Sequence, residues 1–354
     1  MWSWCQWLCQ KARTSGKTPL LINLDETAVP LEFTHARGVV IHQLGRQKIK
    51  QQNLPKHKAS RAAMRCFFTH VALICNDTAV QPLLPQVIFI AGNHLPWKTW
   101  TDIQRVLPKN VFVRRQKSGW SNAEQHQEIL KVLKLSLEPV LVTMQPILNF
   151  DCAPIHLHGT TIALLGELDI WWFLIPKKLT WLFQPLDTHA FMKYKRYIRH
   201  QWMDTLAADA GRRRVFDAVN IVIGAIRKVL QGHRWKHAFN DNGLGDDTSG
   251  TSKYIRNQLQ WEELPQIVPQ PPTQEMLSSA WPVNRRLPLL EIYTSLNLEL
   301  VDPMPVAVGA APPDSIMAGA DDDEAEADMV DEELDTCIGD MPPISDDDMP
   351  LASL

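Results

Sequence analysis

The sequence lacks the features that mark secreted and membrane proteins. Its six cysteines stand at 5, 9, 66, 75, 152 and 337 and form no CxxC pair, so we expect free thiols in a reducing compartment. No uninterrupted apolar stretch reaches the roughly 18 residues that a membrane span needs. The tryptophan-rich start, MWSWCQWLCQ, has neither the charged region nor the small-residue cleavage site of a signal peptide. These absences predict an intracellular protein that enters no membrane.

Positive charge is missing from one end of the chain. From Asp314 onward there are 15 acidic residues and no Lys or Arg, which leaves 36 basic and 24 acidic residues before that point. A folded part with this surplus suits a polyanionic partner such as DNA, and a merely basic soluble domain is the alternative. The acidic tail cannot bury enough apolar surface to offset its ordering entropy, so we expect it to be disordered. It would solubilise the chain, shield the basic core or recruit a protein partner.

Strand-like and helix-like patterns alternate through the middle of the chain, which indicates an α/β sheet. A helix is expected over 2–14, and Ser121 with Glu124 forms a capping box that predicts the start of another helix. The predicted strands are PLLINLDETAV, GVVIHQL, AMRCFFTHVALIC, PQVIFIAG, VTMQPILNF and DIWWFLIP. Further helices are predicted in TTIALLGEL, THAFMKYKRYIRHQWMDTL, FDAVNIVIGAIRKVLQG and RWKHAF.

These patterns divide the chain into five segments, with no internal repeat. They are a short N-terminal helix (1–19), an α/β domain (20–205), a helical extension (206–260), a Pro-rich connection (261–312) and the acidic tail (313–354).

Three aspartates each close or follow an apolar run, namely Asp25 in LLINLDET, Asp151 in MQPILNFDCAPIH and Asp187 in WLFQPLD. One such Asp is ordinarily a turn residue or a helix cap. Several carboxylates that converge on divalent ions can support two-metal phosphoryl transfer. Their hard oxygen ligands suit Mg²⁺ or Mn²⁺.

Other acidic residues near these positions are weaker candidates for metal ligands. Glu167 and Asp169 compete with Asp187, but Asp169 opens the next strand and should lie at the opposite end of the sheet. Glu26 follows Asp25 directly, so it should face the other side of its strand.

The motifs LDET, DCAPIH and QPLDTHAFMKYKRYIR, with 35 residues between Asp151 and Asp187, resemble the DDE-type transposase superfamily in its pogo, Tigger and jerky branch, which is related to centromere protein B. The resemblance covers about 20–239, including KHK, Trp120 and RWKHAF. It implies a ribonuclease-H-like (integrase-like) mixed sheet flanked by helices. It also implies that Asp25, Asp151 and Asp187 are the metal ligands of a D-D-D triad that holds two Mg²⁺ or Mn²⁺ ions. Family members often read QPLDVG where this chain has Thr188 and His189.

The resemblance extends to residues around the triad. His156 matches the histidine of DxxPxH, which implies a contact to a metal ligand or a phosphate, and a polar helix-start residue is the alternative. The helix after Asp187 carries four basic residues, which either contact DNA phosphates or form a solvated basic face: Lys193, Lys195, Arg196 and Arg199. Tyr194 and Tyr197 are expected to pack. The run Arg212–Arg214 suggests a phosphate patch or a weak nuclear signal.

Two functions stay open at this point. One is a metal-dependent DNA endonuclease and strand-transfer core, which the three retained acids favour. The other is a domesticated or decayed transposon relic that binds DNA or protein without catalysis. The acidic tail favours the relic. So does the short segment before the first strand, which has only about 20 residues here, whereas family members carry helix-turn-helix modules at this place. Expected partners are DNA and a second copy in a homodimer, and the expected location is nuclear.

Overall fold

A six-stranded mixed sheet forms the centre of the described structure, a computed structural model that describes residues 1–30, 67–116, 122–208, 215–245, 248–273, 292 and 294–296. The strand order is β4-β3-β2-β1-β5-β6. The strands are β1 (Thr18–Pro30), β2 (Phe67–Cys75), β3 (Gln86–Ala91), β4 (Val111–Gln116), β5 (Met144–Phe150) and β6 (Trp171–Leu174). All described residues belong to one compact unit, Met1–Val301.

The strand directions confirm the predicted fold class. β1, β2 and β3 pair antiparallel, whereas β5 runs parallel to β1, β6 parallel to β5 and β4 parallel to β3. This is the ribonuclease-H-like mixed sheet that the sequence predicts. The parallel strands β5 and β6 are buried along almost their whole length, which explains why they read as continuous apolar runs rather than as alternating ones.

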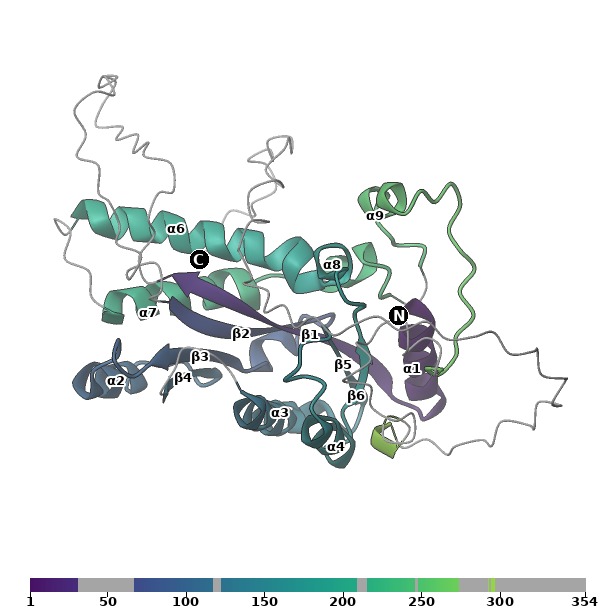
Figure 1. Cartoon of the computed structure of the whole chain (residues 1–354), viewed down its shortest axis with the longest axis horizontal. Helices are drawn as coiled ribbons and strands as arrows, with labels where there is room; N and C mark the ends of the chain where they lie inside the picture. Colours follow the sequence, from purple (N-terminus) through teal and green to yellow (C-terminus); the bar gives the residue numbers. More distant parts are fainter. Residues whose placement is uncertain are drawn as a thin grey trace, which may run out of the picture. The chain divides into compact units, whose positions relative to one another are not determined.

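Helices cover both faces of the sheet, with α6 and α7 over one face and α3 and α4 over the other (Figure 1). The α-helices are α1 (Trp2–Thr14), α2 (Trp97–Gln104), α3 (Ala123–Leu137), α4 (Gly159–Glu167), α5 (Thr180–Phe183), α6 (Phe191–Ala208), α7 (Val215–Ala225), α8 (Lys236–Asp241) and α9 (Lys253–Gln258). Short 3₁₀ turns η3 (Gln81–Leu83) and η4 (Glu138–Val140) and π-helical turns η5 (Leu186–Ala190) and η6 (Ile226–Gln231) complete the set. Across the described ranges, no helix is both long and apolar enough to span a bilayer.

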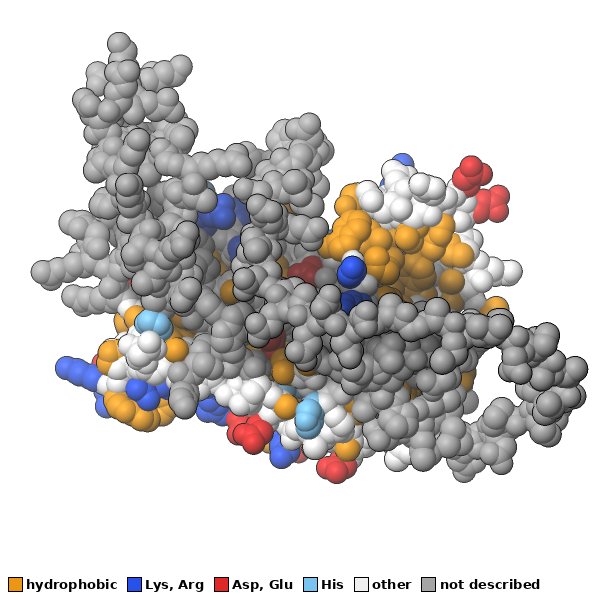
Figure 2. Space-filling model, in the orientation of Figure 1, with side chains coloured by type: hydrophobic (Ala, Val, Ile, Leu, Met, Phe, Trp, Pro, Cys, Tyr) orange, Lys and Arg blue, Asp and Glu red, His pale blue; other side chains and the backbone are white. Residues whose placement is uncertain are grey.

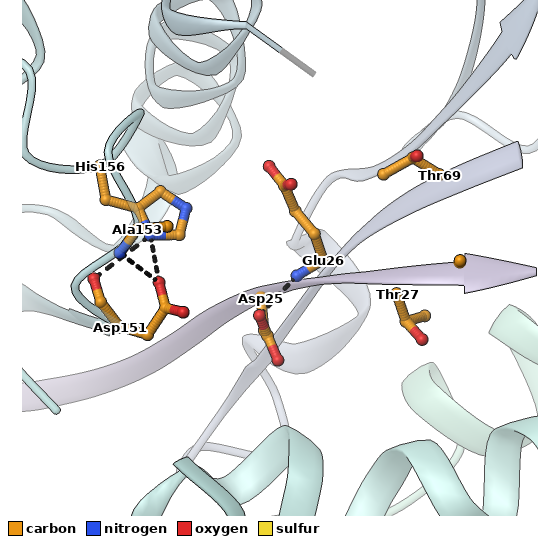
Figure 3. A pocket seen from close by; sticks show the side chains of 8 residues that line it. Asp25, Glu26, Thr27, Thr69, Asp151, Ala153 and His156 are labelled. Atoms are coloured by element: carbon orange, nitrogen blue, oxygen red, sulfur yellow. Dashed lines mark hydrogen bonds and ion pairs between the residues drawn. The ribbon is translucent and has the colours of Figure 1, made fainter. Parts of the chain in front are cut away.

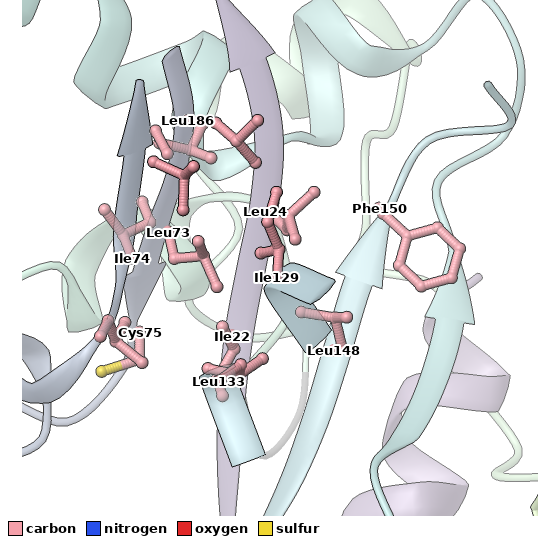
Figure 4. Packing of buried hydrophobic residues seen from close by; sticks show 14 of the residues in the cluster. Ile22, Leu24, Leu73, Ile74, Cys75, Ile129, Leu133, Leu148, Phe150 and Leu186 are labelled. Atoms are coloured by element: carbon pink, nitrogen blue, oxygen red, sulfur yellow. The ribbon is translucent and has the colours of Figure 1, made fainter. Parts of the chain in front are cut away.

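The main core lies between the sheet and its helices. Ile22 and Leu24 of β1 and Leu148 of β5 are fully buried, and Ile129 and Leu133 of α3 join them (Figure 4).

Helix α1 is part of the same core, because Trp4 is buried with its ring centroid 5.2 Å from that of Trp172 in β6. A smaller apolar cluster contains residues of α5 and α9, among them Phe183 and Ile255. Figure 2 shows hydrophobic side chains gathered beside α9.

Several local predictions need correction. The N-cap of α3 is Asn122 rather than Ser121: its side chain accepts from the N–H of Gln125 at 2.9 Å, and its own N–H donates to the Gln125 side chain at 3.0 Å. The predicted Ser121–Glu124 box is therefore wrong by one residue, because Asn with Gln fills the same roles one position later. The elements α2, β4 and α9 were not predicted.

Some predictions fall on other parts of the chain. Five predicted features lie outside the described residues: the strand expected at 38–44, the KHK segment, Trp120, the run 212–214 and the tail at 313–354. The five segment boundaries remain predictions.

Candidate active site at the carboxyl edge of the sheet

Asp25 and Asp151 occupy equivalent positions on neighbouring parallel strands. The last paired residues of β1 and β5 are Asn23 and Asn149. Each aspartate stands two residues farther along the chain, Asp25 within β1 and Asp151 directly after the end of β5. Side chains of a strand alternate between faces with a period of two, so the two carboxylates emerge on the same side of the same edge. Both aspartates line one cavity of about 250 Å³, which makes this edge the candidate site.

A buried asparagine, Asn23, holds the turn that carries Asp187 against this edge. The side chain of Asn23 accepts a hydrogen bond from the backbone N–H of Leu186 at 2.8 Å and donates to the carbonyl of Asn149 at 3.2 Å. Asn23 is fully buried, so these bonds are shielded from water. They fix the π-helical turn η5, and with it Asp187, against the ends of β1 and β5. π-Helical turns are frequent at functional sites.

The environment of Asp25 disfavours its charged form. Burial raises the pKa of Asp25 well above its ordinary value, and the negative charges of Asp187 and Asp151 raise it further. The N–H of Glu26 donates to Asp25 Oδ1 at 2.7 Å and opposes the shift. The charges of Asp151 and Asp187 both act on Asp25, although Asp187 is not among the residues that line the cavity. Their carboxylate oxygens do not form a group within 4.8 Å of one another. Two ions about 4 Å apart, each bound at about 2.1 Å, would still reach ligands up to about 8 Å apart.

Asp151 differs because a histidine supports its charged form. Burial raises the pKa of Asp151, but His156, through its hydrogen bond and its charge, and the N–H of Ala153 outweigh it, so the pKa lies below its ordinary value. His156 Nδ1 lies 2.7 Å from Asp151 Oδ1, and the N–H of Ala153 donates to the same oxygen at 3.0 Å (Figure 3). The structure therefore brings the predicted His156 into direct contact with the second aspartate.

Asp187 and Lys195 form the outer part of the site. Although the Asp187 side chain is exposed, surrounding protein atoms desolvate its carboxylate and raise its pKa. The charge of Lys195 and a hydrogen bond from Thr180 lower it, while the charge of Asp151 raises it again. Desolvation lowers the pKa of Lys195, against the attraction of Asp187 and Asp25. Lys195 is exposed on α6, and the charges of Asp187 and Asp25 act on it, so it belongs to the electrostatic surroundings of the carboxylates.

The remaining basic residues of α6 have different surroundings. Lys193 Nζ stands 5.9 Å from the ring centroid of Trp235. Arg196 and Arg199 are exposed and available to a partner. Between them, Tyr194 is fully buried and Tyr197 packs against the core, which confirms the prediction that these tyrosines pack.

The positions that depart from the QPLDVG pattern link η5 to the C-terminal helices. His189 Nε2 lies 2.9 Å from Asp241 Oδ2, and Thr188 exchanges hydrogen bonds with the side chain of Asn242.

At the other end of the sheet, Asp169 precedes β6 and accepts from the indole N–H of Trp171 at 3.1 Å. As predicted, Asp169 is remote from the carboxyl edge.

Sequence reasoning missed two residues at this edge. Asn23 lies one period before Asp25 inside an apolar strand, and a buried polar residue at that place was a usable signal. His126 is fully buried on α3 and lies close to Glu26 and His156. Its spacing to Ile129, Leu130 and Leu133 places it on the apolar stripe of the helix, which was the second available signal.

Comparison with known proteins adds little to this geometry. No family model matches the sequence, and no curated protein matches it. Among solved structures, two of the Mos1 transposase overlap with the chain. The Mos1 transposase paired-end complex with the left transposon end is 14% identical with a TM-score of 0.32, and the Mos1 mariner paired-end complex with Mn is 15% identical with a TM-score of 0.31. Each covers 68% of this chain, which spans 60% of the Mos1 chain. So loose an overlap transfers no activity, and the fold assignment rests on the strand order above.

Proposed function

We propose that this chain is a transposase-derived DNA-processing core of the DDE superfamily, in its pogo, Tigger and jerky branch. Its inherited chemistry is the cleavage and joining of DNA phosphodiester bonds with two Mg²⁺ or Mn²⁺ ions. The observation that carries the proposal is the matched register of Asp25 and Asp151, with Asp187 fixed beside them through Asn23. The motifs LDET, DCAPIH and QPLD support it.

The three aspartates fit the ions in donor type and in charge. Carboxylate oxygens are the ligands that Mg²⁺ and Mn²⁺ prefer. Burial and mutual repulsion raise the pKa of Asp25, which is the behaviour of acids gathered without enough positive charge. When bound, the two ions would make the attacking water or 3′-hydroxyl more nucleophilic and stabilise the leaving oxygen.

The other residues of the site would orient the ligands and hold the substrate. His156 and the N–H of Ala153 fix Asp151 through one carboxylate oxygen, which limits its rotation. Lys195 partly balances the charge of Asp187. The exposed Arg196 and Arg199 would contact DNA phosphates on either side of the reacting bond, together with Lys193 and Lys195, independently of base sequence.

A plasmid assay tests the proposal. The purified chain is incubated with supercoiled plasmid and Mn²⁺, beside Asp151→Ala and Asp25→Asn. Asp102→Ala, which removes a half-buried acid on α2 that pairs with Arg105, is the matched control. We expect nicking by the wild type and by the control, and a fall below about 1% in the two site variants, as the loss of a ligand predicts. Equal nicking by wild type and Asp151→Ala, or none by either, would contradict the proposal that the chain is an active enzyme.

The second candidate is a relic that binds DNA without cutting it. It is favoured by the separation of the three carboxylates, whose oxygens do not gather within 4.8 Å. A salt-sensitive shift of DNA without nicking, unchanged in Asp151→Ala, would support this candidate over the enzyme.

A further inference from the structure

A second group of metal-ligand side chains lies on the opposite face of β1. Glu26, His126 and His156, here called the histidine cluster, each offer a ligand atom within 4.8 Å of the others. They come from β1, from α3 and from the turn after β5. Figure 3 shows Glu26 pointing toward the side of His156 while Asp25 points the other way, as alternation along a strand requires.

The two histidines are buried with unused hydrogen-bonding capacity. His126 is 0% exposed and His156 is 2% exposed. Among the residues that the structure describes, neither ring nitrogen of His126 has a hydrogen-bond partner, and the same holds for His156 Nε2. A buried polar atom without a partner is destabilising, so three in one place require an explanation.

Packing alone does not account for this arrangement. His70 is equally buried and its Nδ1 also lacks a partner, but its Nε2 lies 3.2 Å from the side-chain oxygen of Gln86, whereas His126 has no partner at either ring nitrogen among the described residues. The rings of His126 and His156 instead face one another with centroids 4.7 Å apart.

We propose that Glu26, His126 and His156 bind one Zn²⁺ ion. Two imidazoles and one carboxylate form a recognised zinc ligand set that leaves a fourth position open. Tetrahedral bonds of about 2.0–2.1 Å place ligand atoms about 3.3 Å apart, so atoms that lie within 4.8 Å of one another would have to approach by at most about 1.5 Å. Glu26 and His156 line the cavity that Asp25 and Asp151 share, and the fourth position would open there.

The contact between His156 and Asp151 fits this assignment. A histidine that binds zinc usually donates its other ring N–H to a carboxylate, which fixes the ring orientation. His156 engages Asp151 with Nδ1 at 2.7 Å, which leaves Nε2 for the metal. The nitrogen-containing cluster suits Zn²⁺, whereas the all-oxygen aspartate group suits Mg²⁺ or Mn²⁺. The zinc site therefore goes beyond the proposed function and does not depend on it.

Cobalt spectroscopy on the full chain tests the proposal. Metal-free protein is titrated with Co²⁺ in excess Mg²⁺, which occupies all-oxygen sites. We expect one Co²⁺ per chain with the strong visible absorption of a tetrahedral site, and its displacement by Zn²⁺. His126→Gln and Glu26→Gln should weaken binding by about 100-fold or more. Zn²⁺ should raise the Tm of the wild type but not of these variants.

Matched controls separate this site from the aspartate group and from general misfolding. His158→Gln and Glu128→Gln, which change exposed neighbours, should bind Co²⁺ like the wild type. Asp25→Asn should also keep the absorption while losing nicking, so failure of the DNA chemistry leaves the zinc result readable. Circular dichroism of the metal-free variants checks their folding. The proposal is overturned by an absent tetrahedral spectrum in the wild type, or by an unchanged one in folded His126→Gln.

Discussion

The side-chain oxygen of Asn23 accepts a hydrogen bond from the backbone N–H of Leu186 at 2.8 Å, across 163 residues of sequence. Through this bond, the first strand of the sheet positions the turn that carries Asp187. The bond is fully buried, so both partners depend on it.

We predict that Asn23→Leu lowers the free energy of unfolding and impairs the site. It leaves the Leu186 N–H buried without a partner, which costs about 1–3 kcal/mol. Because Asp187 loses its anchor, nicking should fall further than the unfolded fraction explains. Asn76→Leu is the control. The Asn76 side chain also accepts a hydrogen bond from a β1 backbone N–H, that of Leu21 at 3.0 Å, but this bond lies earlier in the strand and away from the carboxyl edge. Urea unfolding and plasmid nicking measure both effects, and equal activity in the two variants would refute the anchoring role.

Alanine at two glycine positions of α4 should change the free energy of unfolding in opposite directions. A Cβ at Gly166 would lie 2.9 Å from the Ser295 Cα, whereas one at Gly159 would meet nothing within 4 Å. Gly166→Ala should therefore destabilise the chain by about 1–3 kcal/mol through overpacking. Gly159→Ala should be neutral or stabilise by up to about 1 kcal/mol through helix propensity. Chemical denaturation distinguishes them, and a stabilising Gly166→Ala would show that the Ser295 backbone yields.

His70 should make stability sensitive to acid. Burial lowers its pKa to about 3, although its contact with Gln86 raises it. The unfolded chain binds the proton near pH 6.5, so the folded form loses about 1.4 kcal/mol per pH unit from this group as pH falls from 6.5 toward 3. His70→Phe should be less stable at pH 7 but show a shallower decline on acidification. Urea unfolding at pH 7, 6, 5 and 4 checks this, and parallel curves would contradict it.

Salt dependence should reveal which arginines contact DNA. If Arg196 and Arg199 each neutralise one phosphate, each change to Gln should reduce the slope of log affinity against log salt by about 0.9. Lys131→Gln, an exposed change on α3, should leave the slope unchanged. Fluorescence anisotropy on a duplex at several salt concentrations measures it. Identical slopes in all three variants would place the DNA elsewhere.

The sequence predicted most of the sheet because buried strands carry their signal locally. Apolar runs such as the one ending at Asp151 identified β5 without knowledge of any partner. Strand pairing is not local, so the equivalence of Asp25 and Asp151 became visible only from the register of Asn23 and Asn149. The exposed elements α2 and α9 were missed because few of their residues are buried, which leaves little apolar pattern to read.

The acidic residues of the site were predicted from the sequence, but most of the residues that surround and position them were not. Strand alternation correctly placed Glu26 on the face opposite Asp25, but nothing local indicated what it would meet there. His126 lies 100 residues away on α3, and only the packing of that helix on the sheet brings it to Glu26. The contact of His156 with Asp151 was open to prediction because a short turn joins the two.

The long span of the Asn23 bonds also constrains how the protein is made. β1 is a central strand, yet Asn23 meets Asn149 across 126 residues and Leu186 across 163. At a synthesis rate of about 5–20 residues per second, one edge of β1 waits roughly 6–25 s for β5, and η5 follows about 2–7 s later. During that interval an apolar strand edge is open to wrong partners. The nascent chain therefore needs protection at the strand from which its candidate active site is later assembled.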